Sequence, residues 1–238
     1  MNEAAGRHIV TAFDQDLKAI SAGIAEMGGI AEEQLGNALE AVRARDTELA
    51  REVIAADRRL DALEMRLEEA AIQTLALRQP MAGDLREVVA ALKIASTLER
   101  IGDLAKNTAK RAQVLNAEPP LRVASSIVRM GKQTQALFTE VLDAYTARDT
   151  ELAVSVWQRD VEIDEMYNSV FRELITYMME DPRVIGLCSQ MQFVAKNLER
   201  IGDHATFIAE MTYFVVEGRP LDDPRPKGDA FSGIMDVE

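Results

Sequence analysis

The sequence contains the pentapeptide Glu-Arg-Ile-Gly-Asp twice, at residues 99–103 and 199–203. Both copies lie in segments that read as long helices, and residues four apart on a helix share one face. Each copy therefore presents a glutamate and an aspartate from successive turns toward one region of space. Two like charges at this spacing destabilise an exposed helix by about 0.2–0.5 kcal/mol when nothing neutralises them. The motif predicts a positive group beside each pair.

A second set of acids with the same spacing precedes each pentapeptide. Asp57 and Asp61 precede the first copy, and Asp160 and Asp164 precede the second. If the two helices of each set pack antiparallel, four carboxylates can surround one site in each half of the chain. The candidate metal ligands are Asp57, Asp61, Glu99, Asp103, Asp160, Asp164, Glu199 and Asp203.

Sites built from carboxylate oxygens alone suit hard cations such as Mg²⁺, Mn²⁺ or Ca²⁺, and iron also accepts carboxylates. The eight acids share one register, one position after a residue of the stripe that is expected to face the neighbouring helix. This placement beside the stripe predicts shallow, water-accessible sites. More than one metal ion per site would help to balance four negative charges.

The same acids could be neutralised without metal. Glutamate and aspartate four residues apart are common on solvated helices, where a nearby arginine can pair with them. Recurrence in four equivalent places favours a metal site, although duplication means that the two halves are not independent evidence. The candidate arginines are Arg58, Arg100, Arg159 and Arg200.

Two other chemistries of helical bundles have less support. A di-iron oxidase needs Glu-x-x-His on two helices. The two histidines are His8, near the N-terminus, and His204, which has Ile201 three positions before it. A phosphotransfer bundle needs an exposed helical histidine, and we interpret His204 instead as a structural residue beside a metal-site acid. With no glycine-rich phosphate loop and no nucleophilic serine motif, the sequence predicts that the protein is not an enzyme.

Composition points to a helical protein of the cell interior. Of 238 residues 47% are hydrophobic and only 5% aromatic, and the abundance of alanine, leucine, glutamate and arginine favours helix. The net charge of −13 argues against nucleic acid as a partner. One cysteine, Cys188, excludes an intramolecular disulfide and fits a reducing compartment. No run of about 20 apolar residues exists, so we expect a cytoplasmic protein that meets membranes only through partners.

Helical periodicity divides each half into three long helices. In the first half, we expect a loose lead-in over residues 1–13 and helices over 14–42, 47–78 and 84–115. Pro80 and Gly83 are expected in the turn that joins the second helix to the third. The apolar stripe of the second helix follows strict heptad spacing. Its members are Leu49, Val53, Ala56, Leu60, Leu63, Leu67, Ala70, Thr74 and Leu77.

The second half repeats the first. Residues 147–153 are identical to residues 44–50, at an offset of 103, and the pentapeptides are offset by 100. We therefore predict an all-α fold of two homologous antiparallel three-helix bundles, six long helices with an internal pseudo-two-fold repeat. The expected division is 1–118 for the first bundle, 119–218 for the second and 219–238 for a mobile C-terminal tail.

These features resemble the PhoU family. The resemblance rests on Leu-Glu-Arg-Ile-Gly-Asp at 98–103 and at 198–203, on the doubled acid-x-x-x-Asp motifs, and on the segment 78–86 before the third helix. It covers residues 14 to 217. The resemblance implies a phosphate-specific transport system accessory protein, commonly a homodimer, that represses the phosphate-starvation response when phosphate is plentiful.

The resemblance also implies partners and a metal. The partners would be the ATPase of the phosphate ABC transporter and the phosphate-sensing histidine kinase. The metal would be divalent or multinuclear (iron, manganese, magnesium or zinc), held by the eight acids named above. The alternative that stays open is a carboxylate-rich bundle that stores or buffers metal outside phosphate signalling.

Overall fold

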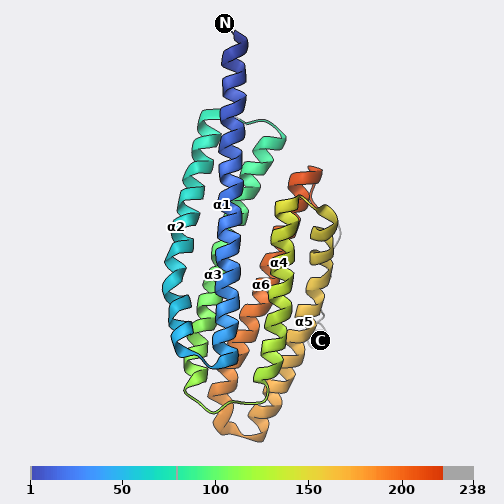
Figure 1. Cartoon of the computed structure of the whole chain (residues 1–238). Coiled ribbons are helices and arrows are strands. Elements are labelled where there is room, and N and C mark those ends of the chain that lie inside the picture. The colour runs from blue at the N-terminus through green and yellow to red at the C-terminus, as the bar shows by residue number, and fades with distance from the viewer. Residues whose placement is uncertain (1, 79, 222–238) are drawn as a thin grey trace, which may run out of the picture.

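The computed structural model describes residues 2–78 and 80–221 of the chain, so most of the predicted C-terminal tail lies outside the described residues. Within that part the fold consists of six long α-helices and one short 3₁₀-helix, without strands (Figure 1). The elements are α1 (Asn2–Ala44), α2 (Thr47–Arg78), α3 (Gly83–Asn116), α4 (Ala124–Ala147), α5 (Thr150–Glu180), η1 (Pro182–Val184) and α6 (Ile185–Glu217). The predicted all-α class is confirmed.

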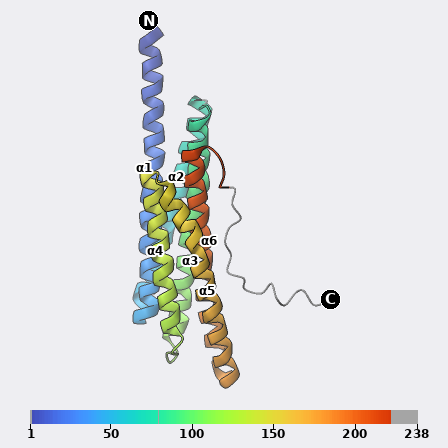
Figure 2. The same ribbon diagram turned by 90° about the vertical axis from the view of Figure 1, so that its right-hand side faces the viewer.

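Helix α1 begins earlier than the sequence analysis expected. Residues 1–13 were expected to form a loose lead-in, whereas α1 is helical from Asn2 and its first turns extend beyond the other helices (Figures 1 and 2). The expectation was wrong because this stretch contains no proline and only one glycine, Gly6. A helix that has already formed extends at little cost through residues such as alanine, glutamate and arginine.

The repeated heptapeptide makes the same structure in both halves. Asp46 Oδ1 accepts a hydrogen bond of 3.0 Å from the backbone amide of Leu49, and Asp149 Oδ1 accepts one of 2.9 Å from that of Leu152. These N-caps satisfy amide groups that the first helical turn leaves unpaired. The caps fix where α2 and α5 begin. They therefore also fix how far along the bundle each helix places its acids.

Each half is a bundle of three helices, and the two bundles contact each other through four of the six long helices. Helices α1, α2 and α3 contact one another, as do α4, α5 and α6, while α1 contacts α4 and α3 contacts α6. Helices α2 and α5 lie on opposite outer sides of the joint (Figure 1). The division at residue 118 falls between α3 and α4, and separate domains stay a prediction.

The contact between α1 and α4 has pseudo-two-fold symmetry. A Cβ atom on Gly28 would lie 2.8 Å from Leu142 Cδ2, and one on Gly131 would lie 2.3 Å from Leu39 Cδ2. Gly28 and Gly131 are separated by 103 residues, as are Leu39 and Leu142, so the two contacts exchange under the repeat. The missing side chains let the two helices approach closely.

The buried stripe of α2 differs from the heptad prediction at a position that matters for the site. Ala56 is exposed and Leu77 is 73% exposed, whereas Asp57 is only 5% exposed. The buried residues Ala50, Asp57 and Ala71 each follow a predicted member of the stripe by one position, whereas the predicted Val53, Leu60, Leu67 and Thr74 are buried. The buried face therefore keeps its seven-residue spacing but is turned slightly around the helix. The expectation of shallow, water-accessible acids is therefore wrong for Asp57, and also for Asp160, which is 1% exposed.

Candidate functional site

The first acidic cluster, Asp57 and Asp61 of α2 with Glu99 and Asp103 of α3, contains a lysine. Lys106 Nζ contacts Asp57 Oδ2 and lies 2.6 Å from Asp103 Oδ1, so one ammonium group links carboxylates from both helices. The side chain of Asp103 is 46% exposed and that of Lys106 only 23%. The structure thus brings Asp57 and Asp103 together through a cation that the protein itself supplies.

Sequence reasoning missed Lys106 and named arginines instead. Arg58 and Arg100 are exposed, and Lys106 is the cation paired with Asp57 and Asp103. The available signal was its position three residues after Asp103, where side chains on a helix are neighbours. Burial by itself would lower the pKa of Lys106, but hydrogen bonds to Asp103 and Asp57 raise it above its ordinary value. The lysine is therefore held in its charged form.

Glu99 lies at the less neutralised end of the first acidic cluster. Burial raises the pKa of Glu99 to about 7, with further contributions from Asp103, Glu64, Asp61 and Asp57. Glu64 is a fifth acid that sequence reasoning missed, although it follows Asp61 by three residues on the same helix. This end of the cluster favours bound protons or a further cation.

Glu64 is itself perturbed. Burial raises its pKa, and a hydrogen bond with Ser96 of α3 opposes that shift. Ser96 thus adds a second polar link between α2 and α3, in addition to Lys106.

The second acidic cluster comprises Asp160 and Asp164 of α5 with Glu199 and Asp203 of α6. A Cβ atom on Gly202 would lie 2.5 Å from Asp160 Oδ1, so the glycine of the pentapeptide is what allows this buried carboxylate to approach the α6 backbone. In the first half, Gly102 instead receives Leu60, whose Cδ2 would lie 2.3 Å from the added carbon. Identical pentapeptides thus make room for different side chains.

Glu199 has one satisfied and one unsatisfied oxygen. Lys196 Nζ lies 2.6 Å from Glu199 Oε1, while Oε2 is buried without a hydrogen-bond partner in the described part of the chain. Burial raises the pKa of Glu199, and the hydrogen bond from Lys196 opposes that rise. A buried carboxylate oxygen without a hydrogen-bond partner destabilises the folded protein, and such an oxygen is suited to bind a cation.

The lysines of the two clusters occupy non-equivalent positions. The repeat places Thr206 where the first half has Lys106, and the Thr206 hydroxyl donates a hydrogen bond of 2.7 Å to the backbone oxygen of Asp203. Conversely, Lys196 replaces Ser96, and its Nζ lies 5.2 Å from the ring centroid of Tyr167, the counterpart of Glu64. The two clusters share their predicted ligands but differ in the groups around them.

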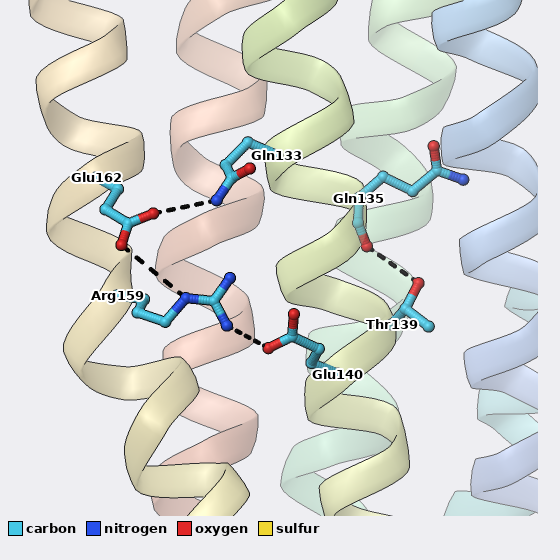
Figure 3. A network of polar contacts seen from close by, with 6 residues as sticks. All are labelled: Gln133, Gln135, Thr139, Glu140, Arg159 and Glu162. Carbon is cyan, nitrogen blue, oxygen red and sulfur yellow. Dashed lines mark hydrogen bonds and ion pairs between the residues drawn. The ribbon is translucent and has the colours of Figure 1, made fainter.

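Arg159, another arginine considered for neutralisation, belongs to a different contact. Its guanidinium pairs with Glu140 of α4, and its Nε lies 4.0 Å from Glu162 Oε1 (Figure 3). Gln133 Nε2 donates a hydrogen bond of 3.0 Å to Glu162 Oε2 in the same network. Arg159 therefore joins α5 to α4, on a different side of α5 from its contact with α6.

His204 is half-buried next to Asp203. Its pKa is lowered by burial and by the positive charges of Arg100 and Arg200, and it is raised to a smaller extent by Asp203. These effects favour the neutral imidazole. The environment fits the interpretation of His204 as a structural residue beside the second acidic cluster.

The present side-chain positions do not form a finished metal site. Among the described residues, no group of three or more His, Cys, Asp or Glu side chains lies in an arrangement that could hold a metal ion. In the first acidic cluster, Lys106 lies between Asp57 and Asp103, so these two predicted ligands already share a cation that the protein supplies. In the second cluster, the unsatisfied Glu199 oxygen fits a cation. The eight ligands stay a prediction.

A cavity of about 400 Å³ lies elsewhere, between α1 and the ends of α3, α4 and α6. Leu17, Ser21, Tyr145 and Val215 contribute to its lining, and the eight predicted ligands do not. Burial raises the pKa of Tyr145 to about 12, so the phenol stays protonated at neutral pH.

None of the helices in the described part of the chain has the length and apolar character needed to cross a membrane.

Comparison with known proteins identifies relatives for nearly the whole chain. The family model described as the PhoU domain matches twice, at residues 24–112 and 127–212. A protein of Caulobacter vibrioides named phosphate-specific transport system accessory protein PhoU homolog is 52% identical over 226 residues, which is 94% of this chain and 98% of that protein. A protein of the same name from Rhizobium meliloti is 47% identical over 97% of this chain and 98% of its own length.

Solved structures agree with this fold. The crystal structure of PhoU from Pseudomonas aeruginosa superposes with a TM-score of 0.85 at 38% identity, covering 87% of this chain and 100% of that one. The phosphate transport system regulatory protein PhoU from Streptococcus pneumoniae gives a TM-score of 0.81 at 26% identity, covering 89% and 100%. The doubled family match also corresponds to the two three-helix bundles.

Proposed function

Because this chain belongs to the PhoU family, we propose that it acts as an accessory protein of a phosphate-specific transport system. The observation that carries the proposal is near full-length similarity, in both directions, to relatives named for that role. The similarity includes both bundles, so the two bundles together, and not one of them alone, correspond to those relatives.

The finer proposal concerns regulation. The protein represses the phosphate-starvation response, as a cytoplasmic homodimer that links the phosphate ABC transporter ATPase to the phosphate-sensing histidine kinase and modulates phosphate uptake. Such a regulator needs different affinities for two states of a partner, and it needs no chemistry of its own. The two similar bundles, with their long helical faces, support this kind of role.

Metal binding is part of the proposal. In the second half, Asp160, Asp164, Glu199 and Asp203 would hold a divalent or multinuclear metal such as iron, manganese, magnesium or zinc. The buried Glu199 oxygen supports this placement. When bound, the cation would supply positive charge between α5 and α6, and the carboxylates would hold the two helices at a fixed separation.

The test is alkaline phosphatase activity in a deletion strain of the source organism, grown with excess phosphate beside its parent. We expect high phosphatase in the deletion and a return to the parental level when the intact gene is supplied. Unchanged phosphatase in the deletion would contradict the proposed repression.

A metal-storing or metal-buffering bundle is the competing function. The unsatisfied acidic oxygen of Glu199 is the observation in its favour. Storage predicts that metal content rises with supply beyond the motif sites, whereas a structural metal saturates. Metal analysis of untagged protein from cells grown at several metal concentrations separates the two.

A further inference from the structure

One end of the α3–α6 joint carries a surface that is both basic and apolar. It comprises residues 104–116 of α3 and residues 185–198 of α6, which lie toward the lower end of Figure 1. Arg111 of α3 donates a hydrogen bond of 2.7 Å to Gln190 of α6, so the two stretches lie side by side. We propose that this basic apolar surface docks an acidic amphipathic helix of a partner protein. The proposal rests on the regulatory role proposed above and names a surface where a partner would be bound.

The apolar part of the surface consists of exposed side chains from both helices. Phe193 of α6 is 53% exposed and Val114 of α3 is 47% exposed. The guanidinium carbon of Arg111 lies 4.6 Å from the centroid of the Phe193 ring, so a cation–π contact holds the ring against α3. Val114 follows Arg111 by three residues and lies on the same face of that helix. Exposed apolar side chains that gather beside charged groups are typical of an interaction site.

The two stretches contain no acid. Their charged residues are Lys106, Lys110, Arg111 and Lys196. Lys106 and Lys196 contact carboxylates that lie outside the two stretches. Lys110 is exposed, and it forms no ion pair with the other described residues. Its charge is therefore available to a partner.

The positive charge continues onto α2. A groove between α2 and α3 has Arg51, Arg58 and Gln113 in its lining, and none of its described lining residues is acidic. Arg51 pairs with the exposed Glu48, whereas Arg58 is exposed and forms no ion pair with the other described residues. Cations therefore border the apolar side chains on the α2 side as well.

The charge of the whole chain decides which partner suits this surface. The net charge is −13, so an acidic partner is repelled by the chain as a whole and attracted to the basic apolar surface. An amphipathic helix presents apolar side chains three or four residues apart on one face, with charged residues beside them. Such a helix can cover Phe193 and Val114 and place carboxylates next to Lys110. An anionic membrane fits less well, because a broad surface also meets the acidic remainder of the chain.

The experiment uses two synthetic helical peptides as probes. One peptide has leucines three and four residues apart on one face and glutamates beside them, and the other has a lysine in place of each glutamate. Binding of each labelled peptide to the intact chain is measured by fluorescence anisotropy at low and at high salt. The difference between the two peptides isolates the contribution of charge.

Two variants of the chain test the two parts of the surface. Phe193→Ser removes the exposed ring, and Met81→Ser, at another exposed apolar side chain, is its control. Lys110→Glu reverses an exposed charge, and Lys93→Glu, at an exposed position nearer the start of α3, is its control. Melting temperature shows whether each variant is folded. If Phe193→Ser does not fold, Lys110→Glu decides the result.

We expect the acidic peptide to bind the wild-type chain about tenfold more tightly than the basic peptide, and its binding to weaken as salt rises. Phe193→Ser and Lys110→Glu should each weaken binding of the acidic peptide by about fivefold or more, because each removes part of the contact. The two control variants should bind like the wild type. The proposal is overturned if the acidic peptide binds no better than the basic one, or if all four variants bind it equally.

Two other occupants of the surface would give different results. Vesicles of phosphatidylglycerol and phosphatidylcholine that bind the wild type but not Lys110→Glu would assign the surface to an anionic membrane. A dimer that Phe193→Ser converts to a monomer in sedimentation equilibrium would assign it to the contact between two copies of the chain. Either result overturns the proposed partner.

The regulatory role fails by a separate measurement. Unchanged phosphatase in the deletion strain contradicts that role and leaves peptide binding to decide what the surface docks. High phosphatase in the deletion strain, together with an acidic peptide that does not bind, overturns the docking surface alone.

Discussion

At the scale of single residues, the identity of a motif does not fix the environment of its carboxylates. Glu99 and Glu199 occupy the same place in identical pentapeptides, yet only Glu199 has a lysine three residues before it. Glu99 is instead surrounded by other acids, and its pKa rises to about 7. The difference comes from the flanking residues that each packed helix pair brings to the site.

The raised pKa of Glu99 predicts a pH dependence of stability. An unfolded glutamate has a pKa near 4.5, so between about pH 4.5 and 7 the folded protein binds more protons than the unfolded chain. The free energy of unfolding should therefore fall as pH rises through this window. Glu99→Gln removes the charge, so we expect it to raise the melting temperature at pH 8, in the presence of chelator, more than at pH 5.

The control for this measurement is Glu33→Gln, at an exposed position of α1. It should change the melting temperature little at either pH. An equal effect of Glu99→Gln at pH 5 and pH 8 would show that ionisation of Glu99 carries no cost in the folded protein.

At the scale of elements, the pairing of α5 with α6 depends on a glycine. Gly202 leaves room for Asp160, which is buried between the two helices. The corresponding contact of α2 with α3 places Leu60 against Gly102. The glycine of the pentapeptide therefore lies nearest to a buried acid in the α5–α6 pair and nearest to an apolar side chain in the α2–α3 pair.

Gly202→Ala tests this packing. The added methyl group would lie 2.5 Å from Asp160 Oδ1, so the carboxylate or the helix must move. We expect a loss of about 1–3 kcal/mol in the free energy of unfolding, the range for overpacked cores, measured by urea denaturation. Gly186→Ala on the same helix meets nothing within 4 Å and should be neutral or stabilising. Equal stability of the two variants would contradict the packing argument.

At the scale of the whole molecule, the repeat is joined by a symmetric interface. The α1–α4 contact pairs Gly28 with Leu142 and Gly131 with Leu39. On the other side of the joint, Asn197 Nδ2 of α6 donates a hydrogen bond of 3.3 Å to Thr108 Oγ1 of α3. These contacts hold the two bundles together and set the relative position of the two acidic clusters.

Gly131→Ala should weaken the joint between the bundles. The new methyl group would lie 2.3 Å from Leu39 Cδ2, and Leu39 is itself buried. We expect a loss of about 1–3 kcal/mol in unfolding free energy by chemical denaturation. Gly29→Ala, beside Gly28 but with nothing within 4 Å, is the control.

A double variant makes the test specific for the interface. Leu39→Ala removes the atoms that the new methyl group would meet, so Gly131→Ala should cost less in that background than in the wild type. Additive effects of the two substitutions would indicate that they do not interact.

Much of the fold was predictable because it depends on local patterns in the sequence. Helix periodicity, the turn at Pro80 and Gly83, and the repeated heptapeptide gave six helices in two related bundles, and the structure confirms them. The lead-in expected at residues 1–13 was wrong, since no residue there stops a helix. The predicted stripe of α2 was wrong at Ala56 and Leu77. Asp57, one position after Ala56, is buried instead, because the packing of α2 against α1 and α3 decides which face is covered.

The candidate site was predictable only in part. The structure places the predicted acids of each half on neighbouring helices, and it adds Glu64, Lys106 and Lys196, which the motif does not contain. Lys106 could have been suspected from its distance to Asp103. Its contact with Asp57, 49 residues away, could not.

The sequence alone determined the elements, the repeat and the family, because helix formation and motif spacing depend on residues only a few positions apart. Tertiary structure alone decided that Asp57 and Asp160 are buried and that Lys106 pairs with both Asp57 and Asp103. Burial and ion pairing depend on which helix faces pack together. Each residue of a helix is turned by about 100° from the one before it, so a buried face misplaced by one position moves a carboxylate from the solvent into the core.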